Sequence, residues 1–351
     1  MPPANRLATA LERWFLKAAR DLPWRRKRSA WATLVSEILL QQTQVVRVAE
    51  RFPEFMRRFP DPAAMARSPV DAVLRCWRGL GYYRRARSLH AASRQIVTAH
   101  GGEVPGDPIA LRQLPGVGRY TAGAVASIAF GQREPIVDGN VARVVSRLAD
   151  RRASAIDRAG LDWCWDAATR IVQGAPDPGR TNEALMELGA TVCTPVSPRC
   201  ESCPVRSMCA SRKAGSQDIV PPPKPGAKRQ KLVLHGLVDV RDGMVVLERR
   251  ASGLWEGLLS PPLVPGPVGM DLEELQTAGG ALRVEPTCAS FDFQTTHREV
   301  RFVVHPALFG RRAGLRRVRL ARLSGEAVSA AALRVIRAVG QDRPQVDRLK
   351  A

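Results

Sequence analysis

The sequence predicts an all-α amino-terminal domain followed by a smaller α+β domain. Apolar residues recur at helical spacing through residues 1–212. A proline- and lysine-rich segment follows, and beyond it short β-branched and apolar runs alternate with turn signals. At 351 residues, the chain is long enough for two domains that each bury a core.

The helical part is divided by short glycine and proline breaks at residues 79–81, 101–105 and 174–179. The first apolar pattern runs without such a break from Trp31 to Phe52, so it predicts helix throughout. Further helices are expected over residues 69–77, 84–100, 121–130, 141–148, 161–173 and 182–192.

The segment 214–231 is stiff and polar, which predicts a linker between domains at residues 1–213 and 232–351. In the second domain a turn signal at Arg241–Gly243 separates two β-rich runs. The expected strands lie at residues 232–240, 244–248, 291–293 and 300–305. We also expect a basic tail over Arg311–Arg322.

The chain carries 54 Lys and Arg against 33 Asp and Glu, a formal net charge of +21. Such a surplus favours a polyanionic partner, most commonly nucleic acid, although an arginine-rich soluble surface is the alternative. The sequence lacks an apolar run of the roughly 18 residues that span a bilayer, and its start lacks a signal-peptide pattern. We therefore expect a cytosolic protein whose seven cysteines are thiols or metal ligands.

Four cysteines have the spacing C-x6-C-x2-C-x5-C: Cys193, Cys200, Cys203 and Cys209. Four thiolates this close in a reducing compartment need a common partner, and zinc and a [4Fe–4S] cluster are the candidates. Zinc ribbons usually present two C-x2-C pairs and this segment has one, so the spacing favours the cluster. The other three cysteines are isolated and are expected to be buried thiols: Cys76, Cys164 and Cys288.

The segment Leu114-Pro-Gly-Val-Gly118 lies between two predicted helices. Gly116 and Gly118 allow a tight turn whose N–H groups, with the start of the next helix, suit a DNA phosphate. On its own, the segment is also compatible with an ordinary turn between helices.

This hairpin, Val137-Asp-Gly-Asn140 and the four-cysteine loop resemble the endonuclease III superfamily of helix-hairpin-helix DNA glycosylases. Within it, the chain from about Leu11 to Cys209 resembles the adenine DNA glycosylases, the MutY family. Four segments carry this resemblance: Leu22-Pro-Trp-Arg25, Ser36-Glu-Ile-Leu-Leu-Gln-Gln-Thr-Gln-Val45, Gly79-Leu-Gly-Tyr-Tyr83 and Asn182-Glu-Ala-Leu-Met-Glu-Leu-Gly189. The second domain resembles that family's Nudix-like domain more loosely, in Leu247-Glu-Arg-Arg250 and Gly253-Leu-Trp-Glu256.

The resemblance implies a monomeric base excision repair enzyme with a [4Fe–4S] cluster. It would hydrolyse the N-glycosidic bond of adenine mispaired with 8-oxoguanine or guanine in double-stranded DNA. Bifunctional relatives carry a lysine after the hairpin, whose amine forms a Schiff base with the sugar. Tyr120 stands there in this chain, which excludes a lyase step through this position.

Two carboxylates are the candidate catalytic groups. Glu37 lies in an apolar helix, where burial raises the pKa of a carboxylic acid, although a solvated helix position is the alternative. The resemblance assigns Glu37 to protonating adenine N7 and then activating water. Asp138 is suited to stabilise an oxocarbenium ion, but with Asn140 it also precedes a helix, where capping is the commoner role. In the family, Tyr120 and Asn140 orient this carboxylate and the water.

The target base must leave the duplex to reach these groups. By resemblance, the DNA- and base-binding residues on the oxidised-guanine side are Gln42, Thr43, Leu80, Gly81 and Tyr82, with Tyr82 as the wedge. Arg20, Arg25 and Glu183 match positions of the adenine pocket. Taken alone, the Gly79–Tyr83 segment equally fits a helix end with packed aromatic side chains.

The second domain departs from the family pattern. Active Nudix hydrolases need a glutamate-rich helix to hold Mg²⁺, whereas here only Glu273 and Glu274 follow, so pyrophosphohydrolase activity is not expected. The family's Phe-Ser-His motif aligns with Thr295-Thr-His297. Thr296 keeps a hydroxyl and His297 is retained, so both are expected to contact the lesion, and phosphate contacts from the basic tail are expected to help.

Two other functions fit some of these features. One is a glycosylase for thymine opposite guanine or for oxidised pyrimidines, and the other is a catalytically silent protein that binds damaged DNA. The presence of both Glu37 and Asp138 argues against the silent protein. For a DNA repair enzyme of this kind, we expect a cytoplasmic, nucleoid-associated location.

Overall fold

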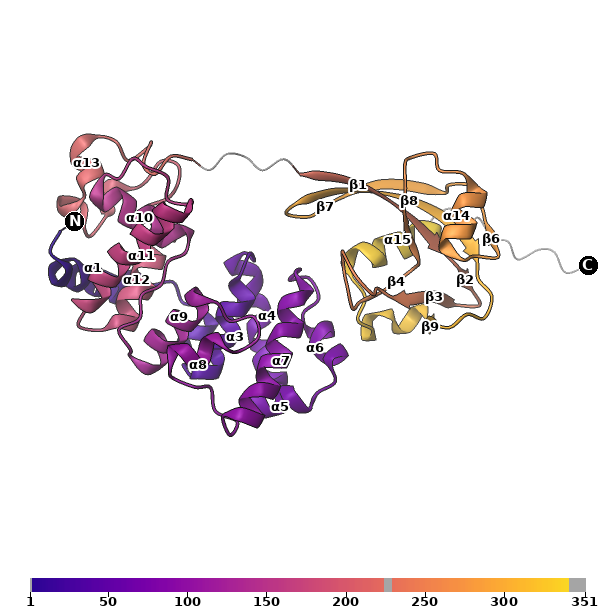
Figure 1. The fold of residues 1–351 in the computed structure, drawn as a ribbon, viewed down its shortest axis with the longest axis horizontal. Helices are drawn as coiled ribbons and strands as arrows, with labels where there is room; N and C mark the ends of the chain where they lie inside the picture. The colour runs from indigo at the N-terminus through magenta and orange to yellow at the C-terminus, as the bar shows by residue number, and fades with distance from the viewer. Residues whose placement is uncertain (1, 224–228, 341–351) are drawn as a thin grey trace, which may run out of the picture. The chain divides into compact units, whose positions relative to one another are not determined.

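A computed structural model describes residues 2–223 and 229–340, and the chain forms two compact units (Figure 1). The first comprises residues 1–68 and 88–225, and the second comprises residues 69–87 and 226–351. The second unit therefore includes a segment that the sequence analysis assigns to the helical domain.

Helices make up the first unit. They are α1 (Ala4–Ala18), α2 (Pro23–Arg26), α3 (Ala30–Leu40), α4 (Val45–Arg58), α5 (Pro62–Arg67), α8 (Pro108–Arg112), α9 (Arg119–Phe130), α10 (Gly139–Ala149), α11 (Arg158–Gln173), α12 (Pro178–Thr191) and α13 (Ala210–Ala214). α6 (Val70–Cys76) lies in the second unit, and α7 (Tyr83–Ala99) has residues in both. Aspartate side chains cap several N-termini, which satisfies N–H groups that lack a partner within the helix.

The continuous helix predicted from Trp31 to Phe52 is wrong. The chain leaves the helix after Leu40 and re-enters it at Val45. Gln42 has a left-handed backbone with φ 55°, which a helix cannot contain. The apolar pattern misses this break because α3 and α4 both bury apolar side chains, so the hydrophobic positions continue across the turn.

α1, α10, α11 and α12 enclose one apolar core (Figure 1). Its buried side chains include Leu11, Val145, Ile171 and Leu188. Three of the four clustered cysteines pack against its edge, Cys193, Cys203 and Cys209. The core therefore fixes the position of α12 relative to α10 and supports the cysteine loop.

The second unit is α+β, as predicted. One sheet contains β1 (Gln230–Val238), β5 (Leu263–Pro265), β6 (Arg283–Val284), β7 (Ala289–Gln294) and β8 (Arg298–Leu308), with β1 and β8 parallel. The other contains β2 (Val240–Arg241), β3 (Met244–Arg249), β4 (Leu259–Ser260) and β9 (Leu315–Arg319). The α-helices within residues 229–340 are α14 (Leu272–Gly279) and α15 (Ala330–Gly340).

Two details of this unit, and one of the segment that precedes it in the chain, differ from the expectations. The turn at Asp242–Gly243 joins β3 to the short β2, whereas β1 ends at Val238 and pairs with β5 and β8. The basic segment is not a tail, because it contains β9, which pairs with β3 and buries Val318. Within the predicted linker, Ser216 and Val220 are buried.

Among residues 2–223 and 229–340, no helix combines the length and the apolar character needed to cross a membrane.

Candidate functional site

Glu37 lies on α3 and is 5% exposed, so the burial expected from its apolar surroundings is present. Its Oε2 atom has no hydrogen-bond partner among the described residues. Burial raises the pKa of the carboxyl to about 7, and the charges of Asp138 and Glu183 act in the same direction. A hydrogen bond with Tyr120 and the charge of Arg25 oppose this rise. Glu37 is therefore suited to carry a proton near neutral pH.

Asp138 is the N-cap of α10. Its Oδ1 accepts a hydrogen bond from the Val141 backbone N–H at 2.7 Å, and its Oδ2 accepts one from Asn140 Nδ2 at 2.9 Å. Burial raises the pKa of Asp138, while these hydrogen bonds and the charge of Arg143 oppose the rise. The helix-capping role inferred from the residues is confirmed. Because hydrogen bonds to both oxygens favour the charged form, Asp138 is the better candidate for the anion of the pair.

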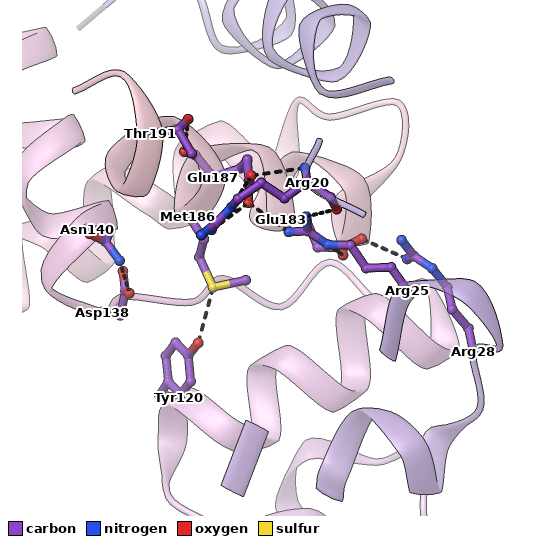
Figure 2. A network of polar contacts seen from close by, with 10 residues as sticks. All are labelled: Arg20, Arg25, Arg28, Tyr120, Asp138, Asn140, Glu183, Met186, Glu187 and Thr191. Atoms are coloured by element: carbon purple, nitrogen blue, oxygen red, sulfur yellow. Dashed lines mark hydrogen bonds and ion pairs between the residues drawn. The ribbon is translucent and has the colours of Figure 1, made fainter. Parts of the chain in front are cut away.

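Tyr120 contacts both Glu37, through a hydrogen bond, and α12. Its hydroxyl lies 3.1 Å from Met186 Sδ (Figure 2). Burial raises the pKa of Tyr120 well above its usual range, and the negative charges of Glu37 and Asp138 add to the effect. The phenol therefore stays protonated and can donate a hydrogen bond into the site.

The residues predicted for the adenine pocket meet in one network of ion pairs (Figure 2). Arg25 Nε is 3.2 Å from Glu183 Oε1, and Arg28 Nη1 is 2.7 Å from Glu183 Oε2. Arg20 and Arg25 both bind Glu187, a buried residue of α12. Met186 and Glu187 stand three and four positions after Glu183, the spacing at which helical side chains share a face.

Arg143 connects this region to the cysteine loop. Its Nη2 donates to Asn140 Oδ1 at 2.9 Å and to the Gly189 carbonyl at 2.8 Å. Its Nε donates to the Cys193 carbonyl at 2.8 Å. A chain of hydrogen bonds therefore runs from Asp138 through Asn140 and Arg143 to the first cysteine of the loop.

The four predicted cluster ligands line one small cavity, together with Arg147, Arg206 and Arg212. Arg147 is buried and its Nη1 lies 3.3 Å from Cys193 Sγ. Among the described residues, no three His, Cys, Asp or Glu side chains are placed to share a single metal ion. One shared cavity is the arrangement that the common ligands of a single cofactor require. Burial raises the pKa of Cys203 to about 12, and a metal cation bound in the cavity would favour the thiolate there.

The hairpin turn connects α8 and α9 in the way the sequence predicted. Gly116 has φ 81°, and a Cβ on it would lie 2.7 Å from Ser88 Cβ, so this position favours glycine. Gly118 is exposed and begins α9 without a side-chain cap. The first N–H groups of α9 therefore remain available to an anion.

The residues predicted to contact the oxidised guanine are divided between the units. Gln42 is exposed and Thr43 is half-buried in the turn between α3 and α4. In the second unit Leu80 is buried and Tyr82 has a left-handed backbone with φ 47°. The Tyr82 hydroxyl is buried and lacks a hydrogen-bond partner among the described residues.

The turn around Gly81 is held by nearby side chains. Trp77 Nε1 donates to the Gly81 carbonyl at 2.9 Å, and Arg85 Nη2 donates to the carbonyls of Leu80 and Gly81. Arg85 also lies over the Tyr82 ring, 5.5 Å from its centroid. These contacts provide the packed aromatic arrangement that the sequence allowed as an alternative to a DNA-contacting turn. The structure is compatible with both.

The predicted lesion-reading residues form the turn between β7 and β8. The Thr295 hydroxyl accepts a hydrogen bond from the Arg298 N–H at 3.0 Å, which closes the turn. Thr296 and His297 are exposed at its tip. The His297 ring lies edge to face with that of Tyr82, with centroids 6.5 Å apart. Two residues assigned to the same base therefore meet in the second unit.

The sequence analysis missed four residues of this region: Arg28, Arg143, Met186 and Glu187. A signal for two of them was available. Met186 and Glu187 lie within the segment Asn182–Gly189, three and four positions after Glu183, the spacing at which helical side chains share a face. Arg28 has its partner Glu183 far away in the chain, and the Arg143 contact that joins the site to the cysteine loop, with Cys193, is also distant, so neither role has a local signal.

Comparisons with known proteins agree with this geometry. Residues 35–158 match the family described as "HhH-GPD superfamily base excision DNA repair protein". Residues 193–209 match the "Iron-sulfur binding domain of endonuclease III", a match that begins at Cys193 and ends at Cys209. The predicted iron–sulfur cofactor is thereby confirmed.

The chain is also similar to proteins named adenine DNA glycosylase. It is 45% identical over 223 residues to one from Mycobacterium tuberculosis, covering 62% of this chain and 71% of the relative. It is 45% identical over 214 residues to the human protein, covering 58% of this chain. The match spans only 39% of the length of the human protein.

Solved structures resemble the helical part. A thermostable thymine-DNA glycosylase has a TM-score of 0.55 and 27% identity, covering 60% of this chain and 97% of the other. Endonuclease III in a non-covalent complex with DNA has a TM-score of 0.50 and 26% identity, covering 61% and 99%.

Proposed function

The chain belongs to the adenine DNA glycosylase family, and on this premise we propose that it removes adenine mispaired with 8-oxoguanine or guanine from double-stranded DNA. The observation that carries the proposal is the contrast between two acids: Glu37 is buried in α3, whereas Asp138 is half-buried at the start of α10. Glu37 has an oxygen without a partner, whereas both Asp138 oxygens accept hydrogen bonds. Their environments separate a proton donor from an anion, as acid–base catalysis requires.

In the proposed reaction, Glu37 transfers its proton to N7 of the adenine. The bond between C1′ and N9 then breaks, and its electron pair leaves with the base. The Asp138 carboxylate stabilises the resulting oxocarbenium ion. Water adds to C1′ and gives its proton to Glu37, which restores the acid. Tyr120 and Asn140 hold the groups in place through the contacts described above.

The described surface supports a nucleic-acid partner. The uncapped start of α9 offers N–H groups to a phosphate, and Gln42 is exposed beside the turn after α3. In the second unit, Arg316, Arg317 and Arg319 are exposed on β9. We assign the oxidised guanine to Gln42, Thr43, Leu80, Tyr82, Thr296 and His297, and place the monomeric enzyme in the cytoplasm with the nucleoid.

A cleavage panel tests the proposal. Duplexes that pair A, T or C with 8-oxoguanine or guanine are incubated with excess enzyme, and abasic sites are revealed with alkali. We expect release of adenine opposite both partners and no release of thymine or cytosine. Thymine release opposite guanine would instead assign the chain the activity named for one of its structural relatives.

The presence of Tyr120 in place of a lysine allows us to predict whether borohydride cross-links the enzyme to DNA. Because a phenol cannot form a Schiff base with the abasic sugar, borohydride is expected not to cross-link the wild-type protein to DNA. The variant Tyr120→Lys is expected to give detectable cross-linking and strand nicking, since Asp138 lies nearby. Gel electrophoresis after borohydride treatment measures both. Efficient cross-linking of the wild type would reveal a different lysine nucleophile.

A substitution of Thr296 tests whether the turn between β7 and β8 contacts the 8-oxoguanine base. Because Thr295 closes the turn and Thr296 is exposed, Thr296→Ala is expected to weaken binding to A:8-oxoguanine more than to A:G. One lost base contact costs about 1–3 kcal/mol. The exposed Ser290 of β7 supplies the control Ser290→Ala, which should change neither affinity. Equal weakening on both duplexes would indicate a phosphate contact instead.

A further inference from the structure

Glu187 is 1% exposed, and among the described residues its two carboxylate oxygens accept hydrogen bonds from Arg20 and Arg25 (Figure 2). Its Oε1 accepts from Arg20 Nε at 2.6 Å and from the Arg20 backbone N–H at 3.1 Å. Its Oε2 accepts from Arg20 Nη2 and Arg25 Nη2, both at 3.0 Å. Two hydrogen bonds from one guanidinium to one carboxylate fix both planes.

Arg25 is consequently held from three sides. It donates to Glu187, to Glu183 at 3.2 Å and to the Arg20 carbonyl at 3.1 Å. Its guanidinium also lies over the Phe15 ring, 4.9 Å from the centroid. Positive and negative side chains therefore alternate along the network, in the order Arg28, Glu183, Arg25, Glu187 and Arg20.

Two charged residues of this network, Arg25 and Glu183, change the pKa of Glu37, the acid of the site. The positive charge of Arg25 lowers the pKa of Glu37, and the negative charge of Glu183 raises it. Burial opposes ionisation of Glu187, but the hydrogen bond and charges from Arg20 and Arg25 outweigh it and lower its pKa. Glu187 is thus anionic near neutral pH and forms an ion pair with Arg25, the residue whose positive charge acts on Glu37.

We propose that Glu187 is a positioning residue for base excision: its carboxylate holds the guanidinium groups of Arg20 and Arg25, and it balances the charge with which Arg25 acts on Glu37. It acts through these arginines and not on the substrate itself. The assignment rests on the proposed function for its effect on base release, whereas the holding of the two guanidinium groups is a property of the protein without DNA.

A purely structural role is the competing explanation, because Glu187 joins α12 to the segment after α1. Glu12 provides a matched control. It is 7% exposed, lies on α1, and accepts hydrogen bonds from the Asp177 N–H at 3.0 Å and the Thr181 hydroxyl at 2.6 Å. Glu12→Gln therefore perturbs a buried carboxylate at the other end of α12 and spares the arginines.

The test compares single-turnover adenine release by the wild type, Glu187→Gln and Glu12→Gln across pH 5 to 9. We expect Glu187→Gln to slow release about 10- to 100-fold at pH 7, the scale of a lost charged hydrogen bond. The midpoint at which the rate falls with rising pH should also move to lower pH, because Arg25 then acts on Glu37 uncompensated. Affinity for a duplex containing a stable abasic analogue should change less than twofold. For Glu12→Gln we expect a lower melting temperature and an unchanged midpoint.

An unchanged midpoint in Glu187→Gln, with a melting temperature lowered as in Glu12→Gln, would reduce Glu187 to a structural residue. A second measurement avoids catalysis altogether. In ¹⁵N-labelled, DNA-free protein, the signals of Arg20 Nε–H and Arg25 Nη2–H, which both donate to Glu187, should exchange slowly in the wild type and in Glu12→Gln, and be lost in Glu187→Gln. Their persistence in Glu187→Gln would overturn the proposal. If they are lost as expected while the wild type releases no adenine from any duplex, the proposed function fails and the holding of the arginines stands.

Discussion

Replacing Glu37 with glutamine should reduce single-turnover adenine release by about 10²–10⁴-fold, the usual contribution of a positioned acid or base. Glutamine keeps the size of the side chain but has no proton to give to the leaving base. Affinity for the mispaired duplex should be largely unchanged, because the substitution affects the chemical step and not the phosphate contacts. Measuring release under excess enzyme separates the two effects. A rate near that of the wild type would exclude Glu37 as the acid.

The pH dependence gives an independent check on the same residue. With a pKa of about 7, Glu37 is protonated below neutral pH, so the wild-type rate should fall as the pH rises through 7. The raised pKa also has a consequence for stability. Between its ordinary value of 4.5 and about 7, the unfolded chain loses the proton while the folded chain keeps it, so folding becomes less favourable as the pH rises.

This penalty is complete above pH 7 and absent below pH 4.5. A shift of this size corresponds to about 3 kcal/mol. Glu37→Gln should therefore unfold at a higher temperature than the wild type at pH 8, and at a similar temperature at pH 4.5. Glu12→Gln, which removes another buried carboxylate, should show no such gain. Equal melting temperatures of Glu37→Gln and wild type at pH 8 would mean that Glu37 is not desolvated in solution.

Loss of a cluster ligand should have the second large effect. Cys200→Ser is expected to lose nearly all bound iron and the visible absorbance of a thiolate-ligated cluster, because one of the four thiolates that line the cavity is removed. The variant should also aggregate on purification, since the loop packs against the core shared by α1, α10, α11 and α12. Iron analysis and visible spectroscopy of the purified protein measure both outcomes.

The control is Cys288→Ser, which removes a single thiol from the second unit. It should keep the iron content and colour of the wild type. Wild-type protein that contained zinc and no iron would contradict the assignment. Retention of a full complement of iron in Cys200→Ser would remove Cys200 from the ligand set.

Several parts of the site were predictable because their signals are local. The apolar neighbours of Glu37 indicate a buried acid, and the position of Asp138 before a helix predicts its capping role, which the contact with Val141 confirms. The spacing of the four cysteines selects the cofactor, since residues within 17 positions of one another share a loop whatever the remaining chain does. Each of these inferences needs only nearby residues.

Other parts were not predictable because they depend on residues far apart in the sequence. Glu187 lies 167 positions from Arg20 and 162 from Arg25, and it is the packing of α1 against α12 that joins these regions. The strand pairing depends on distant residues in the same way. β1 pairs in parallel with β8, from Gln230 with Arg298 onward, and the local turn signal carried no information about this pairing.

The sequence by itself thus determined the helical class of the first domain, its iron–sulfur loop, the two carboxylates and the absence of a lysine at Tyr120. These follow from periodicity, spacing and residue chemistry. Only the tertiary structure decided the break at Gln42, the network centred on Glu187 and the link from Asn140 through Arg143 to Cys193. The physical reason is that a buried charge is stable only beside its partner, and in this chain the partners are brought together by helix packing.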